Sequence, residues 1–290
     1  MVSFWDVQNK NKIYSYLFAF FVFLILASLF FGIIYIFNLP PLLVIILSLF
    51  SIIYPLFIYL YSYKIILFFT GAKPADPIKD VYLINTGEGL ALAAGFKKPP
   101  KFYILEDPAP NAFATGPDPD HAVIAVTRGL LNLTNRQELE GVLAHEMSHI
   151  KNYDTRFMTF VVVMIGMISF LAGFFRYSSN SRRSKESGNI TIFLILLSIL
   201  APLISRLIAL AISRKREFLA DASAVQLTRN PEGLASALEK IKNSPQSSID
   251  YGPASALFIS DPKTDFLESV SNLFSTHPPI NERIKILRSM

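Results

Sequence analysis

The sequence predicts a mostly α-helical membrane protein that also carries an α+β domain with a small β-sheet. Of its 290 residues, 52% are hydrophobic and 17% are charged, whereas ordinary soluble domains carry about 25% charged residues. The mean hydropathy is +0.41. Long apolar runs alternate with polar segments that contain short extended patterns, and this alternation predicts membrane helices joined to a polar α+β part.

Four apolar stretches have about the length of a membrane helix, which needs roughly 20 residues. The first of them is too long for the core of a signal peptide, and no small-residue cleavage site follows it, so we interpret it as an anchor. The four predicted spans are Ile13–Phe37, Leu42–Phe69, Met158–Phe175 and Ile190–Ile212.

These stretches divide the chain into four parts. Residues 1–72 form a predicted two-helix membrane anchor, and residues 157–213 form a membrane hairpin. Residues 73–156 and 214–290 are two polar parts, which we expect to combine into one catalytic domain. The chain would thus be a multi-pass protein whose domain is split by a hairpin.

Basic residues cluster at the ends of the apolar stretches that flank the polar parts, while the turn at residues 38–41 has no charge. This bias places the polar parts in the cytoplasm, at the cell membrane. The connector at residues 176–189 is also basic, so either Met158–Phe175 does not fully span or the summed bias overrides this loop. We therefore expect the basic residues behind the net charge of +5 to face an anionic lipid bilayer. Nucleic acid is not expected as a partner.

The first polar part is predicted to begin with a helix, Asp80–Gly95, and to continue with two strands, Lys101–Glu106 and His121–Thr127. Asn111–Gly116 is a third short extended piece between proline-rich turns. A helix follows at Gln137–Asn152.

Thr134 and Gln137 have the spacing of a capping box at the start of that helix. The second polar part is predicted to hold helices at Glu217–Thr228 and Pro231–Ile241, and a final helix begins near Pro279.

His145-Glu146-Met147-Ser148-His149 reads as HExxH within the predicted helix. Residues four apart lie on one helix face, so both imidazoles can bind one metal ion while Glu146 points to the same site. The chain has no cysteine, which leaves His, Asp and Glu as ligands. The pattern indicates a zinc hydrolase.

A catalytic zinc ion normally takes three protein ligands, so a third must come from elsewhere. Asp154 follows His149 by only five residues and would reach the ion awkwardly. Glu217 lies where the last apolar stretch ends, and Asp221 would share its helix face. Glu217 could bind the ion with Asp221 orienting His145, or it could simply pair with Arg214 or Arg216 on a solvated helix face.

Four segments together resemble the HtpX-type membrane metalloproteases, relatives of the CAAX-prenyl zinc proteases. They are NAFATG, HEMSHIKNYD, SRKREFLAD and STHPPINERI, and the resemblance covers nearly the whole chain. It implies a zincin-like metalloprotease domain facing the cytoplasm and ATP-independent proteolysis of misfolded or membrane proteins.

The same resemblance implies roles for individual residues. One Zn²⁺ per chain would be bound by His145, His149 and Glu217, with Glu146 as the catalytic base and Asp221 beside the ligands.

His277 and Arg283 are candidates for stabilising the oxyanion that forms during peptide hydrolysis. Before two prolines, a histidine is usually a loop residue or a helix cap, and His277 could also replace Glu217 as a ligand. The resemblance favours a catalytic role for His277.

Asn111, Ala112, Phe113 and Ala114 form a predicted edge strand on which an extended polypeptide substrate could pair through its backbone. We expect this strand to border the cleft, with Asn111 making a polar contact to substrate. The strand could equally be a purely structural hairpin edge.

Several other functions compete with proteolytic quality control. A non-catalytic membrane scaffold or chaperone would keep zinc for structure, but it would have no use for Glu146, and structural zinc is closed by four protein ligands. A CAAX-type processing protease is a further alternative. An intramembrane protease is disfavoured because polar residues flank the motif. A transporter is disfavoured because the apolar stretches lack the inward-facing polar residues expected of a transport pathway. Substrate identity and oligomeric state have no signature in the sequence.

Overall fold

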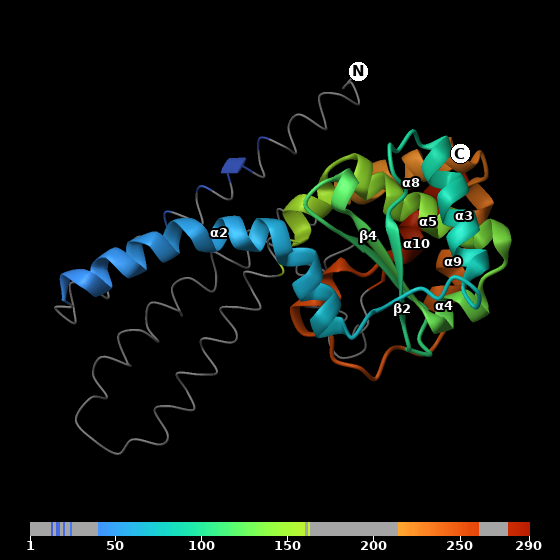
Figure 1. The fold of residues 1–290 in the computed structure, drawn as a ribbon. Coiled ribbons are helices and arrows are strands. Elements are labelled where there is room, and N and C mark those ends of the chain that lie inside the picture. Colours follow the sequence, from blue (N-terminus) through green and yellow to red (C-terminus); the bar gives the residue numbers. More distant parts are fainter. Residues whose placement is uncertain are drawn as a thin grey trace, which may run out of the picture.

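The computed structural model describes residues 40–159, 214–260 and 278–290, together with residues 13, 16, 17, 20, 24 and 162. Helix α2 (Pro41–Thr70) extends away from the rest of the described chain (Figure 1). Pro41 opens this helix, and Gly71 ends it in the left-handed conformation with φ 69°, which glycine adopts without steric cost.

The predicted membrane spans are largely outside this description. Three of them, Ile13–Phe37, Met158–Phe175 and Ile190–Ile212, fall almost entirely on residues that are not described, as does the basic connector at 176–189. Within the described residues, no helix combines the length and the apolarity needed to cross a bilayer.

A four-stranded sheet, in the order β1-β2-β4-β3, forms the base of the site. Strands β2 (Lys101–Leu105) and β4 (Val123–Thr127) are parallel, while β1 (Lys73–Pro74) and β3 (Ala112–Thr115) pair antiparallel to their neighbours. All residues of β4 are buried, as expected for a β-branched run in the middle of a sheet. The small sheet agrees with the predicted α+β character, and β3 lies at its edge.

Helices pack against this sheet on the side that carries the HExxH motif, where α5, α8, α9 and α10 lie close together (Figure 1). Helix α5 (Arg136–Lys151) is central and contacts α8 (Arg214–Thr228), α9 (Pro231–Lys242) and β3. The remaining elements are α3 (Val81–Ala93), η1 (Pro119–His121), α4 (Arg128–Leu133), η2 (Gly252–Leu257) and α10 (Ile280–Leu287).

The apolar side of α5 supplies much of the core. Leu139, Val142, Leu143 and Ile150 are fully buried and belong to one cluster with residues of the sheet and of α9. Gly141 lets α9 approach closely, because a Cβ there would lie 2.7 Å from the backbone nitrogen of Leu234. The motif helix is therefore clamped between sheet and helices.

The cap of α5 differs from the prediction by one residue. Asn135 is the N-cap and accepts from the Glu138 amide at 3.0 Å, while Glu138 accepts from the Asn135 amide at 2.8 Å. Thr134 instead donates to the Leu130 carbonyl. The predicted Thr134–Gln137 box is wrong, because Asn135 and Glu138 have the same spacing one position further along and asparagine is the stronger N-cap. Glu138 also has hydrogen-bond partners outside α5.

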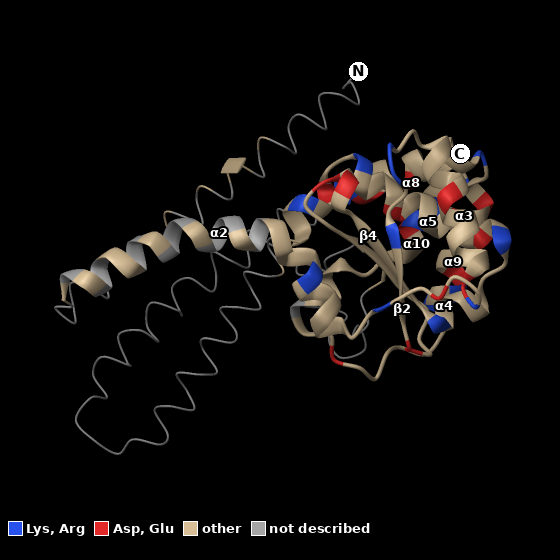
Figure 2. Cartoon of the chain, viewed as in Figure 1, with Lys and Arg blue, Asp and Glu red and all other residues tan. Residues whose placement is uncertain are grey.

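Those partners lie on α9. Ser236 donates to Glu138 at 2.6 Å and Lys240 does so at 2.7 Å. Charged side chains of this kind are spread over the α+β part, whereas the described portion of α2 is nearly free of them (Figure 2). The start of the motif helix is thus held by a charged link to a helix about 100 positions later.

Candidate metal centre and cleft

His145 and His149 lie one turn apart on α5, and their rings face each other. Their Nε2 atoms are 3.2 Å apart, and the ring planes are nearly perpendicular at 88°. His145 is 1% exposed, while His149 is partly exposed toward the cleft. The rigid helix therefore presents two imidazole nitrogens to one point.

Glu217 reaches the same point from the first turn of α8. Its Oε2 lies 3.6 Å from His145 Nε2, and its Oε1 lies 3.5 Å from His149 Nε2. The carboxylate is 5% exposed. These three residues form a group whose candidate ligand atoms all lie within 4.8 Å of one another, so the packing of α8 on α5 brings together donors that are far apart in sequence.

The spacing of these donors fits a small tetrahedral ion. Zinc binds nitrogen and oxygen ligands at about 2.0–2.2 Å, and tetrahedral angles then place two ligand atoms about 3.3–3.5 Å apart. The three measured separations are 3.2, 3.5 and 3.6 Å. Two imidazoles and one carboxylate also match a known ligand set of catalytic zinc.

Two carboxylates behind the imidazoles fix which ring nitrogen carries the proton. His145 Nδ1 lies 3.0 Å from Asp221, and His149 Nδ1 lies 3.2 Å from Asp154. When each Nδ1–H donates to its carboxylate, the lone pairs of both Nε2 atoms point at Glu217. Lone pairs and a carboxylate directed at one point favour a cation between them.

The charges around the two imidazoles favour positive charge in this region. Burial lowers the pKa of His149, but the charge of Glu217 and the hydrogen bond to Asp154 outweigh it and raise that pKa to about 9. Burial and Arg283 lower the pKa of His145, yet its bonds to Asp221 and Glu217 leave it raised. Metal binding must displace such protons.

Arg283, from α10, is fully buried beneath these residues. Its Nε and NH2 donate to the two oxygens of Asp221 at 2.9 and 2.7 Å, a bidentate pairing that fixes the carboxylate plane. Although burial alone raises the pKa of Asp221, the charge of Arg283 lowers it to about 2. Asp221 is therefore ionised and oriented toward His145.

We call His145, His149 and Glu217 together the metal group. The guanidinium of Arg283 also contacts this group directly. NH2 lies 3.3 Å from His145 Nε2, and NH1 lies 3.6 Å from Glu217 and donates to the Ile259 carbonyl at 3.3 Å. Arg283 thus joins α8, α5 and the chain at Ile259. It therefore lies beside His145 and Glu217 as well as Asp221.

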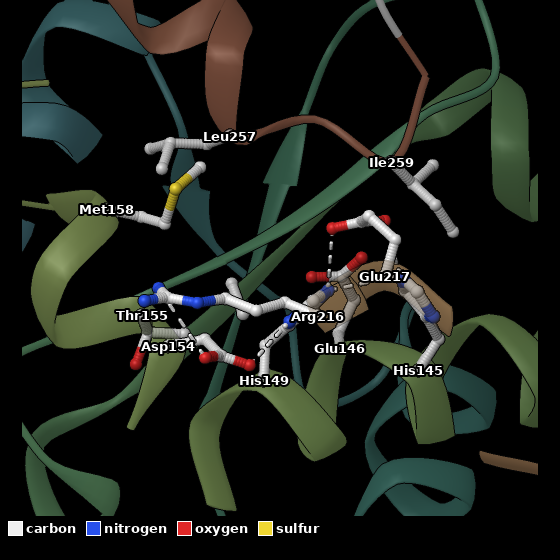
Figure 3. Close-up of a pocket in the computed structure, with 11 residues that line it drawn as sticks. His145, Glu146, His149, Asp154, Thr155, Met158, Arg216, Glu217, Leu257 and Ile259 are labelled. Carbon is white, nitrogen blue, oxygen red and sulfur yellow. Dashed lines mark hydrogen bonds and ion pairs between the residues drawn. The ribbon is translucent and has the colours of Figure 1, made fainter. Parts of the chain in front are cut away.

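Glu146 is 2% exposed and lies beside the metal group. Its negative charge contributes to the raised pKa of His149, and the side chains of Glu146, His149 and Glu217 converge in the cleft (Figure 3). The cleft is lined by Ala114, His145, Glu146, His149, Asp154, Thr155, Met158, Arg216, Glu217, Leu257 and Ile259.

The four residues of the predicted substrate strand have different surroundings. Ala114 lines the cleft, while Ala112 is fully buried and Phe113 packs on Phe258 with ring centroids 5.0 Å apart. The Asn111 amide donates to the Ser260 carbonyl at 2.8 Å and accepts from its amide at 3.3 Å. The structure therefore brings Ala114 to the metal group and gives Asn111 a backbone partner within the chain.

Other residues of the site were missed or are not described. The sequence suggests Asp154 only as an awkward metal ligand, whereas in the structure its carboxylate orients His149. Tyr153, with φ 60°, turns the chain so that Asp154 faces back toward the helix. Leu257 and Ile259 had no distinguishing pattern in the sequence. His277 falls outside the described residues.

Comparisons with known proteins point to the same family that the sequence segments resemble. The model of Peptidase family M48 matches residues 77–290. Proteins named Protease HtpX homolog are similar over most of the chain. The one from Dictyoglomus turgidum is 43% identical over 292 residues, covering 99% of this chain and 95% of the relative. The one from Caldanaerobacter subterraneus subsp. tengcongensis is 45% identical over 296 residues, covering 99% and 97%.

A solved structure shares the fold. The crystal structure of S. mikatae Ste24p matches with a TM-score of 0.50 and 23% sequence identity, covering 97% of this chain and 66% of that one. At this identity the match informs on fold alone.

Proposed function

The chain belongs to peptidase family M48, and from this premise we propose that it is a membrane-bound zinc metalloendopeptidase with its active site facing the cytoplasm. Its resemblance to HtpX-type proteases, predicted from four sequence segments, is confirmed by the full-length relatives. We assign to it ATP-independent hydrolysis of misfolded or damaged membrane and cytoplasmic proteins.

The observation that carries the proposal is the convergence of His145 Nε2, His149 Nε2 and a Glu217 oxygen at tetrahedral spacing, with Glu146 alongside. We propose these three side chains as the protein ligands of one Zn²⁺. When bound, zinc supplies Lewis-acid activation of a water molecule and of the scissile carbonyl. Three ligands leave one position open, as catalysis requires.

Glu146 moves the proton in this scheme. Its carboxylate removes a proton from the water that adds to the scissile carbonyl carbon, and it delivers that proton to the leaving amine nitrogen as the C–N bond breaks. Its position next to His149 places it at the cleft side of the ligands.

Asp221 and Asp154 hold the two imidazoles with their Nε2 lone pairs directed inward. Arg283 fixes Asp221 through two hydrogen bonds and is fully buried. We therefore assign Arg283 to positioning, in place of the oxyanion role that the sequence suggested. His277 retains its predicted role in stabilising the oxyanion.

The substrate backbone is proposed to pair with the outer edge of β3 at Ala114. The carbonyl of Asn111 accepts from the β4 residue Thr127, and the carbonyl of Ala112 accepts from Ile259 on the opposite side. Backbone groups alternate in direction along a strand, so the N–H and C=O of Ala114 point outward, beside the metal group.

The membrane part of the proposal comes from the four apolar stretches of the sequence and the basic residues at their ends. Residues 1–72 would anchor the chain, and residues 157–213 would form a hairpin between the two catalytic parts. This arrangement would hold the cleft at the membrane surface.

The proposal is tested with the full-length chain purified in detergent and supplied with zinc. Wild-type protein is expected to bind one zinc per chain and to cleave casein, whereas Glu146→Gln keeps the metal and loses about 100- to 10,000-fold in rate. Glu140→Gln, on the same helix and at a residue paired with surface Arg136, is the matched control and should retain full rate. Casein cleavage by Glu146→Gln at the wild-type rate would overturn the mechanism.

A further inference from the structure

The segment 251–260 wraps around the outer edge of β3. Phe258 packs against Phe113 on one face of the sheet, while the next residue, Ile259, belongs to the core on the other face. At the crossing, the Ile259 amide donates to the Ala112 carbonyl at 2.9 Å. This wrapping segment therefore changes from one face of the sheet to the other within two residues.

Both ends of the wrapping segment are anchored. At its start, the Tyr251 hydroxyl donates to Asp107 at 2.6 Å, and Asp107 is 2% exposed. At its end, Ser260 is held by both polar atoms of the Asn111 amide. Between them, Phe258 is 1% exposed and contacts two aromatic rings. Such a segment is a fixed wall of the cleft.

This wall also determines where a substrate can pair. It occupies the edge of β3 at Ala112, so among the described residues the edge without a backbone partner begins at Ala114, which lines the cleft. A substrate residue directly opposite Ala114 would have its side chain on the same face of the sheet. That face carries the metal group.

The surface around this position is apolar on one side. Met158, Leu257 and Ile259 lie across the cleft from Glu146 and His149 (Figure 3), and with the methyl group of Ala114 they present only aliphatic or thioether atoms. A charged side chain placed there would lose its hydration without gaining a partner from this wall.

We propose that Leu257, Ile259, Met158 and Ala114 form a specificity subsite for an aliphatic side chain of small to medium size next to the scissile bond. The free volume in the cleft is about 30 Å³, room for about two water molecules. Any side chain larger than this must displace lining atoms, and an aromatic ring requires a larger displacement of the anchored wall than an aliphatic side chain does. The inference rests on the proposed function and names the substrate residue that this site selects.

The test uses the zinc-loaded full chain and three quenched-fluorescence peptides that differ at one residue, Leu, Phe or Lys, on the side of the scissile bond identified by mass spectrometry of a cleaved parent peptide. Wild-type protein is expected to prefer the Leu peptide over the Phe and Lys peptides by about tenfold or more in kcat/KM. This is the usual size of discrimination by a single apolar pocket. Leu257→Ala enlarges the subsite and should shift the Phe-to-Leu ratio about tenfold toward Phe.

Leu257→Val, a smaller change, guards against misfolding and should shift the same ratio in the same direction by a smaller factor. Ile241→Ala is the matched control, because Ile241 lies on α9 and is 6% exposed, against 7% for Leu257; its ratio should equal that of the wild type. Cleavage with unchanged ratios in both Leu257 variants would overturn the subsite. Absence of any zinc-dependent cleavage by the wild type would instead overturn the proposed function.

Discussion

The metal group and the opposite wall of the cleft are built in different ways. His145, His149 and Glu217 are positioned by buried charges, each imidazole having its own carboxylate partner and Asp221 being held by Arg283. Leu257 and Ile259 are positioned by apolar packing and by backbone bonds to β3. The comparison teaches that a change in the metal group should abolish activity, while a change in the wall should only alter which substrate is cleaved.

The strongest challenge to this comparison is removal of the third ligand. Glu217→Ala leaves two imidazoles, which is one protein ligand fewer than catalytic zinc sites use. We expect zinc to fall well below one per chain and casein cleavage to drop by at least 1,000-fold, on the order of the loss of a complete catalytic group. Zinc content by plasma mass spectrometry, together with the cleavage rate, measures both.

The neighbouring Glu232, exposed on α9 and paired with Arg288, supplies the control. Glu232→Ala should keep its zinc and its rate. Full zinc occupancy in Glu217→Ala would remove the carboxylate from the ligand set.

Asp221→Asn tests the charged layer behind the ligands, which consists of Asp221, Asp154 and Arg283. The amide is uncharged and no longer matches Arg283 or His145, and loss of such a partner typically weakens metal affinity by about 10- to 100-fold. Competition with a zinc-binding dye measures the change. Asp118→Asn is the matched control, because Asp118 also pairs with a histidine, His121, but on the surface at 2.8 Å.

If Asp221→Asn bound zinc as tightly as Asp118→Asn, the charged layer would have no part in the site. Retained affinity with reduced cleavage would assign Asp221 to catalysis rather than to the metal.

Asp154→Asn is expected to have a smaller effect of the same kind. His149 is more exposed than His145 and its bond to Asp154 is longer, at 3.2 Å against 3.0 Å. We predict a loss of about tenfold in zinc affinity, measured by the same dye competition. A loss larger than that of Asp221→Asn would make Asp154 the more important of the two carboxylates.

The smallest effect should come from the link between α5 and α9, which lies outside the cleft. Hydrogen bonds from Lys240 and Ser236 outweigh burial and lower the pKa of Glu138 below its ordinary 4.5. A lowered folded-state pKa contributes stability that is present above pH 4.5 and lost as the pH falls through the folded-state value.

Glu138→Gln should therefore lower the free energy of unfolding by about 1–3 kcal/mol at pH 7, and the difference from wild type should shrink as the pH falls below 4.5. Thermal unfolding at several pH values measures it, with Glu140→Gln as the control. An equal difference at pH 7 and pH 3.5 would show that the carboxylate charge is not involved.

Much of the metal group could be predicted from the sequence because the information is local. His145, Glu146 and His149 share one helix, and Glu217 and Asp221 share another, so helical spacing alone defines which side chains point together. Only the meeting of the two helices required the resemblance to a family.

The rest depends on contacts that no local pattern contains. Asp154 reaches His149 through a turn at Tyr153, whose positive φ is unusual for a non-glycine residue. The hydrogen bonds that Lys240 and Ser236 donate to Glu138 join α5 to a helix about 100 positions later. Leu257 and Ile259 look like any apolar residues until the chain crosses the edge of β3.

Zinc K-edge X-ray absorption of the purified full-length chain is the most direct test of the central claim, the joint binding of one ion by two imidazoles and a carboxylate. We predict a first shell of nitrogen and oxygen at about 2.0–2.2 Å with the multiple-scattering signature of two imidazoles. A spectrum without imidazole scattering, or full proteolytic activity in protein stripped of metal, would contradict it.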